Sequence, residues 1–342
     1  MINPLDITGI KEYSRKTALA REPFVSVVIN FYNEKDNVDM APACLCRQTY
    51  RNFEVILVDD GSTDDTGEIL VQKYKNVLNF KLLVNQRNEG IRSARLKGVK
   101  AARGDIIITL DMHTIFGNNF IEKIVSIFSN HPEVAIVSPL VVSFGDRFFQ
   151  KGLNVIYKVS FKLRRIMKKY SYAFGGAAAY RRQALYQIGL LRADEVVEDV
   201  DASWRLAKLG WRIHLDDSIM VFHKEPDKLL VLIRKMIAGG INTCYLIFEH
   251  PEKIFYPQSL VRIFGMPIIL LLFTINPKLS VLLLGTTVIL WIIAVKLWSK
   301  EGFLDTIYSL MMISLILALH CLGFWYAMIK KCFKRLIFFL KL

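Results

Sequence analysis

The chain has 342 residues, enough for one large domain or two ordinary ones, and its formal net charge is +14. An apolar content of 53% with a mean hydropathy of +0.31 excludes an average soluble protein. A basic balance is compatible with nucleic acid, an anionic membrane surface or a phosphorylated substrate, but the apolar C-terminal part of the chain favours the last two, and we expect no nucleic-acid partner. The five cysteines fit neither zinc-ligand spacing nor a disulfide framework, which indicates reduced thiols in a cytosol-facing protein.

Apolar, β-branched runs alternate with helical segments over residues 24–138. The predicted strands are Phe24–Phe31, Phe53–Val58, Phe80–Val84, Asp105–Leu110 and Val134–Ser138. The predicted helices are Met40–Arg47, Asp65–Tyr74, Gly90–Ala102 and Phe120–Phe128. This alternation predicts an α/β fold built on a doubly wound, mostly parallel sheet.

Acidic clusters stand at the carboxyl ends of two of these strands. Asp59 and Asp60 follow one strand, and Asp111 and His113 follow another. Ligands of such sheets bind beyond the carboxyl ends of the strands, so the clusters indicate a site. The alternative is that Asp and Gly only make turns there, but two acidic strand ends in one sheet favour a site.

Six segments resemble, in order and spacing, the family 2 glycosyltransferases of the GT-A fold. The first four resemble the nucleotide-binding half: Val25–Glu34, Ile56–Thr66, Asn88–Gly98 and Gly104–His113. Phe174–Arg182 and Val197–Gly210 resemble the acceptor half, and the whole resemblance covers roughly residues 24–225. It implies a GT-A-type sheet domain that uses a nucleotide-sugar donor.

The resemblance implies roles for residues of the nucleotide half. The loop after the first strand would cradle the base and ribose with Phe31, Tyr32, Asn33 and Glu34. Asp60 would accept a hydrogen bond from the base, since a carboxylate is an acceptor and a base edge offers donors. Arg95 would approach the diphosphate, or would simply lie on a solvated helix face.

Asp111-Met112-His113 stands where the family usually carries Asp-x-Asp. Alternation places residues 111 and 113 on one side of the chain, so both could reach one divalent metal. The histidine departs from the family pattern, and its imidazole favours Mn²⁺ over Mg²⁺. His223 lies where some GT-A enzymes carry a later histidine ligand, although a lone histidine after an apolar strand is also an ordinary core or surface residue.

Glu198-Asp199 matches the Glu-Asp pair of the family. The resemblance implies that Asp199 is the general base that deprotonates the acceptor hydroxyl, with Glu198 as its neighbour and Asp201 as a less favoured rival. Alternatively, these acids only start the predicted helix Ala202–Lys208, and both interpretations can hold together. Gly175, Gly176 and Arg234 are assigned to the acceptor side.

Charges nearly vanish beyond Arg262, while the N-terminus lacks the apolar core of a signal peptide. Ile263–Ile275 would make a helix of only about 20 Å, short of a membrane core of about 30 Å. Leu279–Val295 and Thr306–Ile329 are long enough to cross. The basic residues after Ile329 should stay cytosolic, which favours two crossings, with Ile263–Ile275 lying in the interface or re-entering the membrane.

Two further stretches have the sequence pattern of membrane-surface helices. Lys158–Lys169 is basic and amphipathic, and Leu229–Phe248 is apolar with only Arg234 and Lys235 charged. Lys158–Lys169 could also hold the phosphate of a lipid acceptor, or be an ordinary solvated face. The expected organisation is an N-terminal extension (1–23), a catalytic domain (24–228, divided at 113/114), an interfacial segment (229–259), a transmembrane region (260–329) and a cytosolic tail (330–342).

The sequence therefore predicts an integral membrane protein of the plasma membrane or an equivalent membrane, with its catalytic domain in the cytosol. Its expected activity is inverting, metal-dependent, non-processive sugar transfer to a hydroxyl or phosphate of a lipid-linked or membrane-proximal acceptor. A processive polysaccharide synthase is one alternative, but Leu232–Met236 stands where such family members carry Gln-x-x-Arg-Trp. A nucleotidyltransferase and a non-catalytic nucleotide-sugar-binding module are further alternatives.

Overall fold

The structure is a computed structural model of the chain. It describes residues 22–167, 172–174, 176–193, 197–251, 263–265, 267–268, 271–272, 274–298 and 302–340. The chain forms two compact units. The first unit comprises Met1–Val141, Ser171–Asp194 and Glu198–His223, and the second comprises Val142–Tyr170, Glu195–Val197 and Lys224–Leu342.

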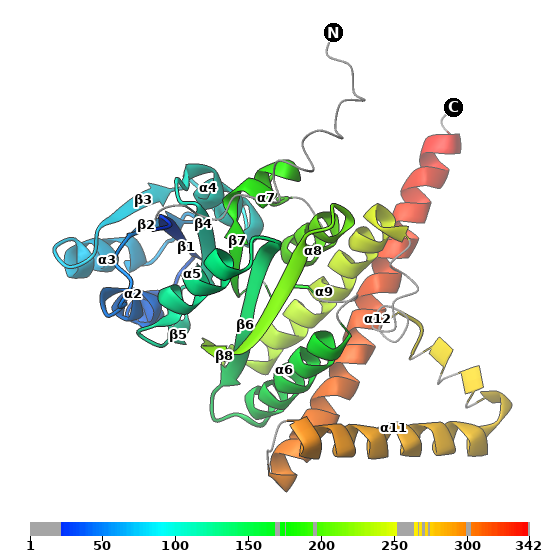
Figure 1. Cartoon of the computed structure of the whole chain (residues 1–342). Coiled ribbons are helices and arrows are strands. Elements are labelled where there is room, and N and C mark those ends of the chain that lie inside the picture. Colours follow the sequence, from blue (N-terminus) through cyan, green and yellow to red (C-terminus); the bar gives the residue numbers. More distant parts are fainter. Residues whose placement is uncertain are drawn as a thin grey trace. The chain divides into compact units, whose positions relative to one another are not determined.

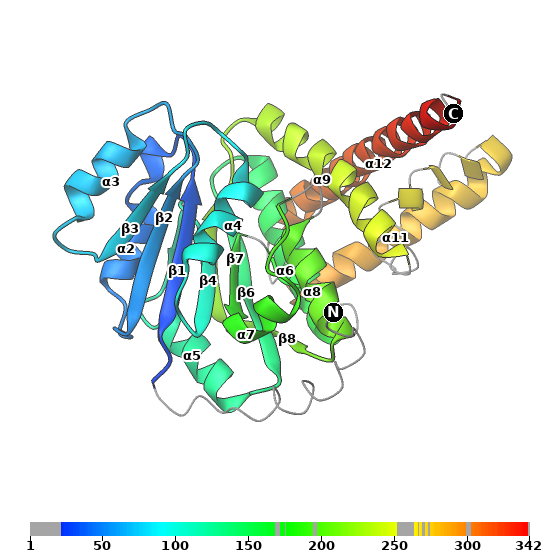
Figure 2. The ribbon, with the colours of Figure 1, turned by 90° about the horizontal axis from the view of Figure 1, so that it is seen from above.

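A single eight-stranded sheet has the strand order β3-β2-β1-β4-β7-β6-β8-β5. The strands are β1 (Val25–Phe31), β2 (Phe53–Asp59), β3 (Phe80–Val84), β4 (Ile106–Asp111), β5 (Thr114–Phe116), β6 (Val134–Phe144), β7 (Ala177–Arg181) and β8 (Arg212–Lys224). Figure 2 shows β3, β2, β1, β4, β7 and β6 in this order across the sheet.

The half of the sheet that carries the predicted strands is parallel. Strand β1 pairs in parallel with β2 on one side and β4 on the other, and β2 pairs in parallel with β3. All seven residues of β1 are buried because it lies between two strands and under helices, as its continuous β-branched run predicts. This parallel arrangement brings the carboxyl ends of β1, β2 and β4 to one edge.

The other half of the sheet is antiparallel, with β7 pairing antiparallel to both β4 and β6, and β5 antiparallel to β8. The predicted strands do not include β5, β7 or β8, and the fifth of them ends at Ser138, whereas β6 continues to Phe144. The alanine-rich β7 (Ala177–Arg181) has weak strand propensity, so its pairing with β4 decides its conformation.

Helices cover the sheet and build the second unit (Figure 1). A short 3₁₀ turn, Lys35–Asn37, precedes them. The helices of the first unit are α2 (Met40–Cys46), α3 (Thr66–Tyr74), α4 (Ile91–Ala101), α5 (Phe120–Asn130), α7 (Arg182–Gln187) and α8 (Glu198–Lys208). Those of the second unit are α6 (Phe148–Ile166), α9 (Leu229–Glu249), α11 (Pro277–Trp298) and α12 (Phe303–Leu340).

Helix α4 contacts the sheet at Gly98. A Cβ atom at this glycine would lie 2.3 Å from Cγ1 of Val28 and 3.0 Å from Cγ2 of Val58. The backbone of α4 therefore lies directly against β1 and β2, which fixes the helix that carries Arg95 relative to the strand ends. A buried cluster that includes Val28, Ala94 and Leu206 joins α4, α7 and α8 on this face.

In the second unit, α9 and α12 run side by side in parallel. Leu232 and Met236 pack in one cluster with Met312, whereas Cys244 and Ile247, further along α9, pack with Phe324 and Ala327, further along α12. Between these clusters the helices approach through glycine. A Cβ atom at Gly240 would lie 2.1 Å from the carbonyl oxygen of His320, and one at Gly323 would lie 2.2 Å from that of Ile237.

Three helices of the described chain are long and apolar enough to cross a membrane: Leu229–Glu249, Ser280–Leu297 and Phe303–Lys331. The predicted crossings Leu279–Val295 and Thr306–Ile329 fall within α11 and α12. Leu229–Glu249, predicted as an interfacial helix, also has the length and composition of a crossing. Within Ile263–Ile275, residues 266, 269, 270 and 273 lie outside the described residues, as do residues 1–21, 252–262 and the last two residues of the basic stretch Lys158–Lys169.

Candidate active site

Three side chains that could hold a metal ion converge at one edge of the sheet. Asp111 ends β4, His113 follows two residues later, and His223 lies on β8 opposite Thr114 of β5. Nε2 of His113 lies 3.2 Å from Nε2 of His223, which in turn lies 3.4 Å from Oδ2 of Asp111. The structure thus brings together the three predicted metal ligands, all within 4.8 Å of one another.

The spacing of these atoms fits a divalent ion. Ligands at adjacent octahedral positions, each about 2.1 Å from the ion, lie roughly 3.0 Å apart. The two separations of 3.2 and 3.4 Å are close to this value. The Nε2 atoms of His113 and His223 face each other, so both could bind one ion.

Gly176 lies against this cluster. A Cβ atom at Gly176 would lie 3.1 Å from Cδ2 of His223 and 3.2 Å from Oδ2 of Asp111, so a side chain would crowd the metal ligands. Its carbonyl oxygen accepts a hydrogen bond from the backbone N–H of Asp111. Gly176, predicted on the acceptor side, thus borders the metal-ligand cluster, while Gly175 lies outside the described residues.

Arg95 is buried at the centre of the site. Its guanidinium donates to Oδ1 of Asp111 at 2.9 Å, to Oε1 of Glu198 and to Oδ1 of Asn30 at 3.3 Å. The solvated-face interpretation of Arg95 is therefore wrong, because the residue is only 3% exposed. Its guanidinium is occupied by protein acceptors and joins the metal-ligand cluster to the Glu-Asp pair.

The contacts of Arg95 keep both its guanidinium and the carboxylate of Asp111 charged. Burial opposes the charge of Arg95, but Glu198 and Asp111 outweigh it and hold the pKa of Arg95 above its ordinary value. Burial would raise the pKa of Asp111, but its hydrogen-bonding contact with His223 and the charge of Arg95 outweigh it and hold that pKa well below its usual range. The site therefore presents Asp111 as a carboxylate, the form that a metal requires.

Glu198 and Asp199 open helix α8, which begins at Glu198 and not at the predicted Ala202. Helix N-termini favour negative charge, so the first turn accommodates both buried carboxyls. Burial, and next the charge of Glu198, raise the pKa of Asp199 to about 7, against the opposing effect of Arg95. Asp201 instead accepts a hydrogen bond from Arg205 at 2.7 Å, an i,i+4 pair inside the helix.

The loop after β1 is bonded to the loop after β2. The backbone N–H of Asn33 donates to Ser62 at 3.0 Å, and the N–H of Thr63 donates to the side chain of Asn33 at 2.8 Å. Asn33 adopts a left-handed φ of 53°, which its short polar side chain tolerates. Tyr32 is 42% exposed beside it, whereas the side chain of Phe31 is buried.

The carboxylate of Asp60 accepts hydrogen bonds from a neighbouring loop of the protein. Its Oδ1 accepts hydrogen bonds from Nδ2 of Asn85 and the N–H of Glu89, and its Oδ2 accepts one from the N–H of Gly90. Three of about four acceptor positions of this carboxylate are thus filled. Asp60 shapes the turn before α4 (Ile91–Ala101), a role that the sequence analysis missed. The role assigned to it there, binding the base, stays a prediction.

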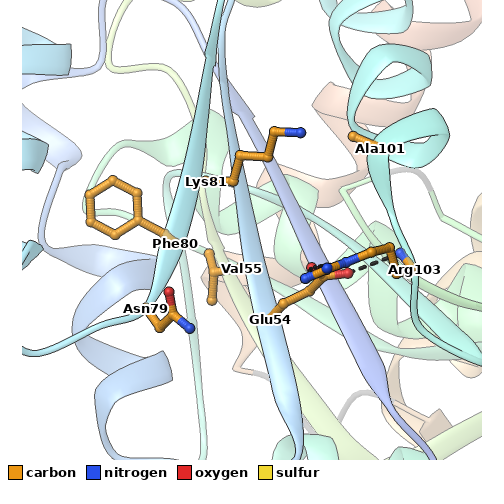
Figure 3. Close-up of a pocket in the computed structure, with 7 residues that line it drawn as sticks. All are labelled: Glu54, Val55, Asn79, Phe80, Lys81, Ala101 and Arg103. Carbon is orange, nitrogen blue, oxygen red and sulfur yellow. Dashed lines mark hydrogen bonds and ion pairs between the residues drawn. The ribbon is translucent and has the colours of Figure 1, made fainter.

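The structure also describes two other predicted site residues. Glu34 turns its carboxylate toward His113, and Arg234 is exposed on α9 of the second unit. Asn30, which was not predicted, contacts Arg95; it is one of two polar residues, with Ser26, in the mostly apolar Phe24–Phe31 run, and that was the available signal. A pocket near Glu54, Phe80 and Arg103 lies at the amino-terminal ends of β2 and β3, whereas Asp59 and Asp60 stand at the carboxyl end of β2 (Figure 3).

Comparison with known proteins agrees with this geometry. Residues 26–189 match the family model described as Glycosyl transferase family 2. A poly-beta-1,6-N-acetyl-D-glucosamine synthase of Staphylococcus aureus (strain MSSA476) is 25% identical over 215 residues, 60% of this chain and 51% of the relative. An N-acetylglucosaminyltransferase of Azorhizobium caulinodans is 24% identical over 254 residues, 70% of this chain and 63% of the relative. The chain thus spans about half the length of the first of these relatives.

Among solved structures, a similar one is the mannosyltransferase PcManGT of Pyrobaculum calidifontis in complex with GDP-Man and Mn²⁺. Its TM-score is 0.63 at 15% sequence identity, and the match covers 90% of this chain and 88% of that chain. At this identity the likeness shows the fold, which is the GT-A type expected from the sequence. Residues 26–189 of this chain are therefore a glycosyltransferase family 2 domain.

Proposed function

We propose that this protein is an inverting, metal-dependent, non-processive glycosyltransferase. It moves a sugar from a nucleotide-sugar donor to a lipid-linked or membrane-proximal acceptor. The observation that carries this proposal is the buried link through Arg95, which bonds to Asp111 of the metal-ligand cluster and to Glu198 of the Glu-Asp pair. A transferase needs leaving-group support and a base near one reacting carbon, and this link holds both sets of groups in one network.

Asp111, His113 and His223 would hold the divalent ion. When bound, it would stabilise the negative charge that develops on the leaving nucleoside diphosphate. Two imidazoles in the ligand set favour Mn²⁺ over Mg²⁺, which prefers an all-oxygen shell. The Mn²⁺ in the solved mannosyltransferase of the same fold supports this preference.

Asp199 would be the general base. Its raised pKa of about 7 makes it a stronger proton acceptor than an ordinary carboxylate and matches the pH at which it would work. Its position in the first turn of α8 fixes the carboxyl next to Glu198. The pairing of Asp201 with Arg205 supports Asp199 as the base over Asp201.

The apolar helices support an acceptor at the membrane. We propose that α11 and α12 anchor the chain in the bilayer, with the catalytic unit in the cytosol, where nucleotide sugars are found. A lipid-linked acceptor would then reach the site without leaving the membrane. Arg234 on α9 and the basic residues of α6 are candidates to meet its phosphate.

The test incubates membranes containing the full chain with labelled nucleotide sugars, beginning with those of N-acetylglucosamine and mannose. We expect label to enter an organic-extractable product, to disappear with EDTA and to return with Mn²⁺. The anomeric configuration of the product, read by NMR, should be opposite to that of the donor. Transfer that persists in EDTA would exclude the metal, and retained configuration would exclude inversion.

A processive polysaccharide synthase is the second candidate, and the name of the Staphylococcus aureus relative favours it. Against it, residues 232–236 lack the Gln-x-x-Arg-Trp motif of processive family members. The length of the product separates the two proposals. One added sugar per acceptor at saturating donor supports the transferase, whereas a ladder of products supports the synthase.

A further inference from the structure

Glu34 is bonded to a metal-ligand candidate instead of facing the loop where a base and ribose would lie. Its Oε1 lies 2.8 Å from Nδ1 of His113, and the two side chains are 17% and 18% exposed. Nδ2 of Asn37 donates to the other oxygen, and the backbone N–H of Glu34 donates to Thr66. Asn37 thus holds the carboxylate, and Thr66 holds the backbone of Glu34, in the position that contacts the imidazole.

This contact fixes the tautomer of His113. A carboxylate only accepts hydrogen bonds, so Nδ1 of His113 must carry the proton that it donates to Glu34. Nε2 then keeps its lone pair, and Nε2 is the atom that faces Nε2 of His223. Metal-binding histidines commonly hold their other ring nitrogen in this way, which orients the ring and raises its basicity.

We propose that Glu34 is a positioning residue of the metal site, acting through His113. This inference rests on the proposed metal dependence and deepens it. It also explains how the site works with histidine in the place of the second Asp. The imidazole brings no charge of its own, and Glu34 supplies the outer carboxylate that holds it in its ligand orientation.

The test measures binding of Mn²⁺ alone to the purified full chain, by electron paramagnetic resonance of the free ion. We expect Glu34→Gln to weaken Mn²⁺ binding by about 10- to 100-fold, the usual cost of losing an outer partner of a metal ligand. Asp39→Asn is the matched control. It removes a carboxylate five residues further along, bonded to Lys73 and Tyr74, and should leave Mn²⁺ binding unchanged.

A second measurement separates positioning from direct contact with the donor. Binding of UDP and GDP is measured in EDTA, where the metal plays no part. If Glu34 acts through His113, Glu34→Gln binds these nucleotides as the unmodified chain does. Loss of nucleotide binding in EDTA with unchanged Mn²⁺ binding would overturn the proposal. It would favour direct contact of Glu34 with the base and ribose.

A third measurement separates orientation from simple charge. In a His113→Asp background the hydrogen bond to Nδ1 no longer exists, so Glu34→Gln should change Mn²⁺ affinity by less than threefold. An equally large loss in both backgrounds would show that Glu34 acts by its charge alone, and would overturn the proposal. If the unmodified chain binds no Mn²⁺, the proposed metal dependence itself fails. If Glu34→Gln binds Mn²⁺ as tightly as the unmodified chain, only the proposed role of Glu34 fails.

Discussion

In the first unit, charged side chains meet in the interior. Arg95, Asp111 and Glu198 are each less than 10% exposed, and Arg95 is bonded to both acids. In the second unit, α9 and α12 meet through backbone contacts at Gly240 and Gly323. The first arrangement should fail when one charge is removed, and the second when one methyl group is added. The two units therefore respond to opposite kinds of substitution.

The largest effect should come from Asp199→Asn in the first unit. The amide cannot take a proton from the acceptor, so we expect transfer to fall by roughly 10²- to 10⁴-fold. Binding of nucleoside diphosphate should be unchanged, because the metal-ligand cluster is intact. The measurement is transfer rate beside nucleotide affinity, and an unchanged transfer rate would remove Asp199 from its proposed role.

Next in size is the removal of the central cation by Arg95→Met. It leaves two buried carboxylates without their partner, which should lower the free energy of unfolding by about 3–5 kcal/mol. Arg103→Met is the control, because Arg103 pairs with Glu54 at the surface, where ion pairs contribute little. Denaturant unfolding, followed by the fluorescence of the tryptophans of the first unit, measures the free energy of unfolding of both variants. Equal losses in the two variants would contradict a special role for Arg95.

For the second unit we predict the effect of one added methyl group. Gly240→Ala should weaken the packing of α9 on α12 by about 1–3 kcal/mol, because its Cβ would meet the backbone of His320. Gly285→Ala on α11 is the matched control, since nothing lies within 4 Å of its Cβ. Thermal unfolding in detergent should separate the two, while Mn²⁺ binding stays unchanged in both.

The smallest predicted effect is a dependence on pH. Transfer should rise with pH and reach half its maximum near the Asp199 pKa of about 7, since the base must be deprotonated. The same raised pKa means that the folded chain binds more protons than the unfolded chain between about pH 4 and pH 7. This group therefore makes the free energy of unfolding fall as pH rises through that window. Asp199→Asn should abolish this contribution; a slope that survives would belong to another group.

Strand patterning predicted the parallel half of the sheet closely, with Phe80–Val84 matching at both ends. The antiparallel half was largely missed, because β7 and β5 are short and depend on partners distant in sequence. In the site, the resemblance predicted Asp111, His113 and His223 as one group, and the structure brings all three together. Spacing could not reveal that Arg95 is buried between two carboxylates.

The missed contacts share one physical reason. The bonds of Glu34 to His113 and of Asp60 to the turn at Glu89 and Gly90 join loops that follow different strands. Such loops meet only after the sheet has formed. A sequence motif specifies the residue types, but it does not specify which polar groups form hydrogen bonds with each other. The helix start at Glu198 was missed for a local reason, because Val197 and Glu198 give no capping signal.

The parallel course of α9 and α12 restricts the possible membrane topologies of the chain. Lys331 lies over the ring of Phe248, with its Nζ 3.7 Å from the ring centre, so the last turn of α9 and residue 331 share one level. Helix α9 begins five residues after the catalytic strand β8 ends. If α9 crosses the bilayer, Lys331 emerges on the face opposite the catalytic unit, and if α9 lies along the surface, Lys331 remains on the catalytic face. A single cysteine at position 331, probed from each side with an impermeant thiol reagent, would therefore report the path of a helix eighty residues upstream.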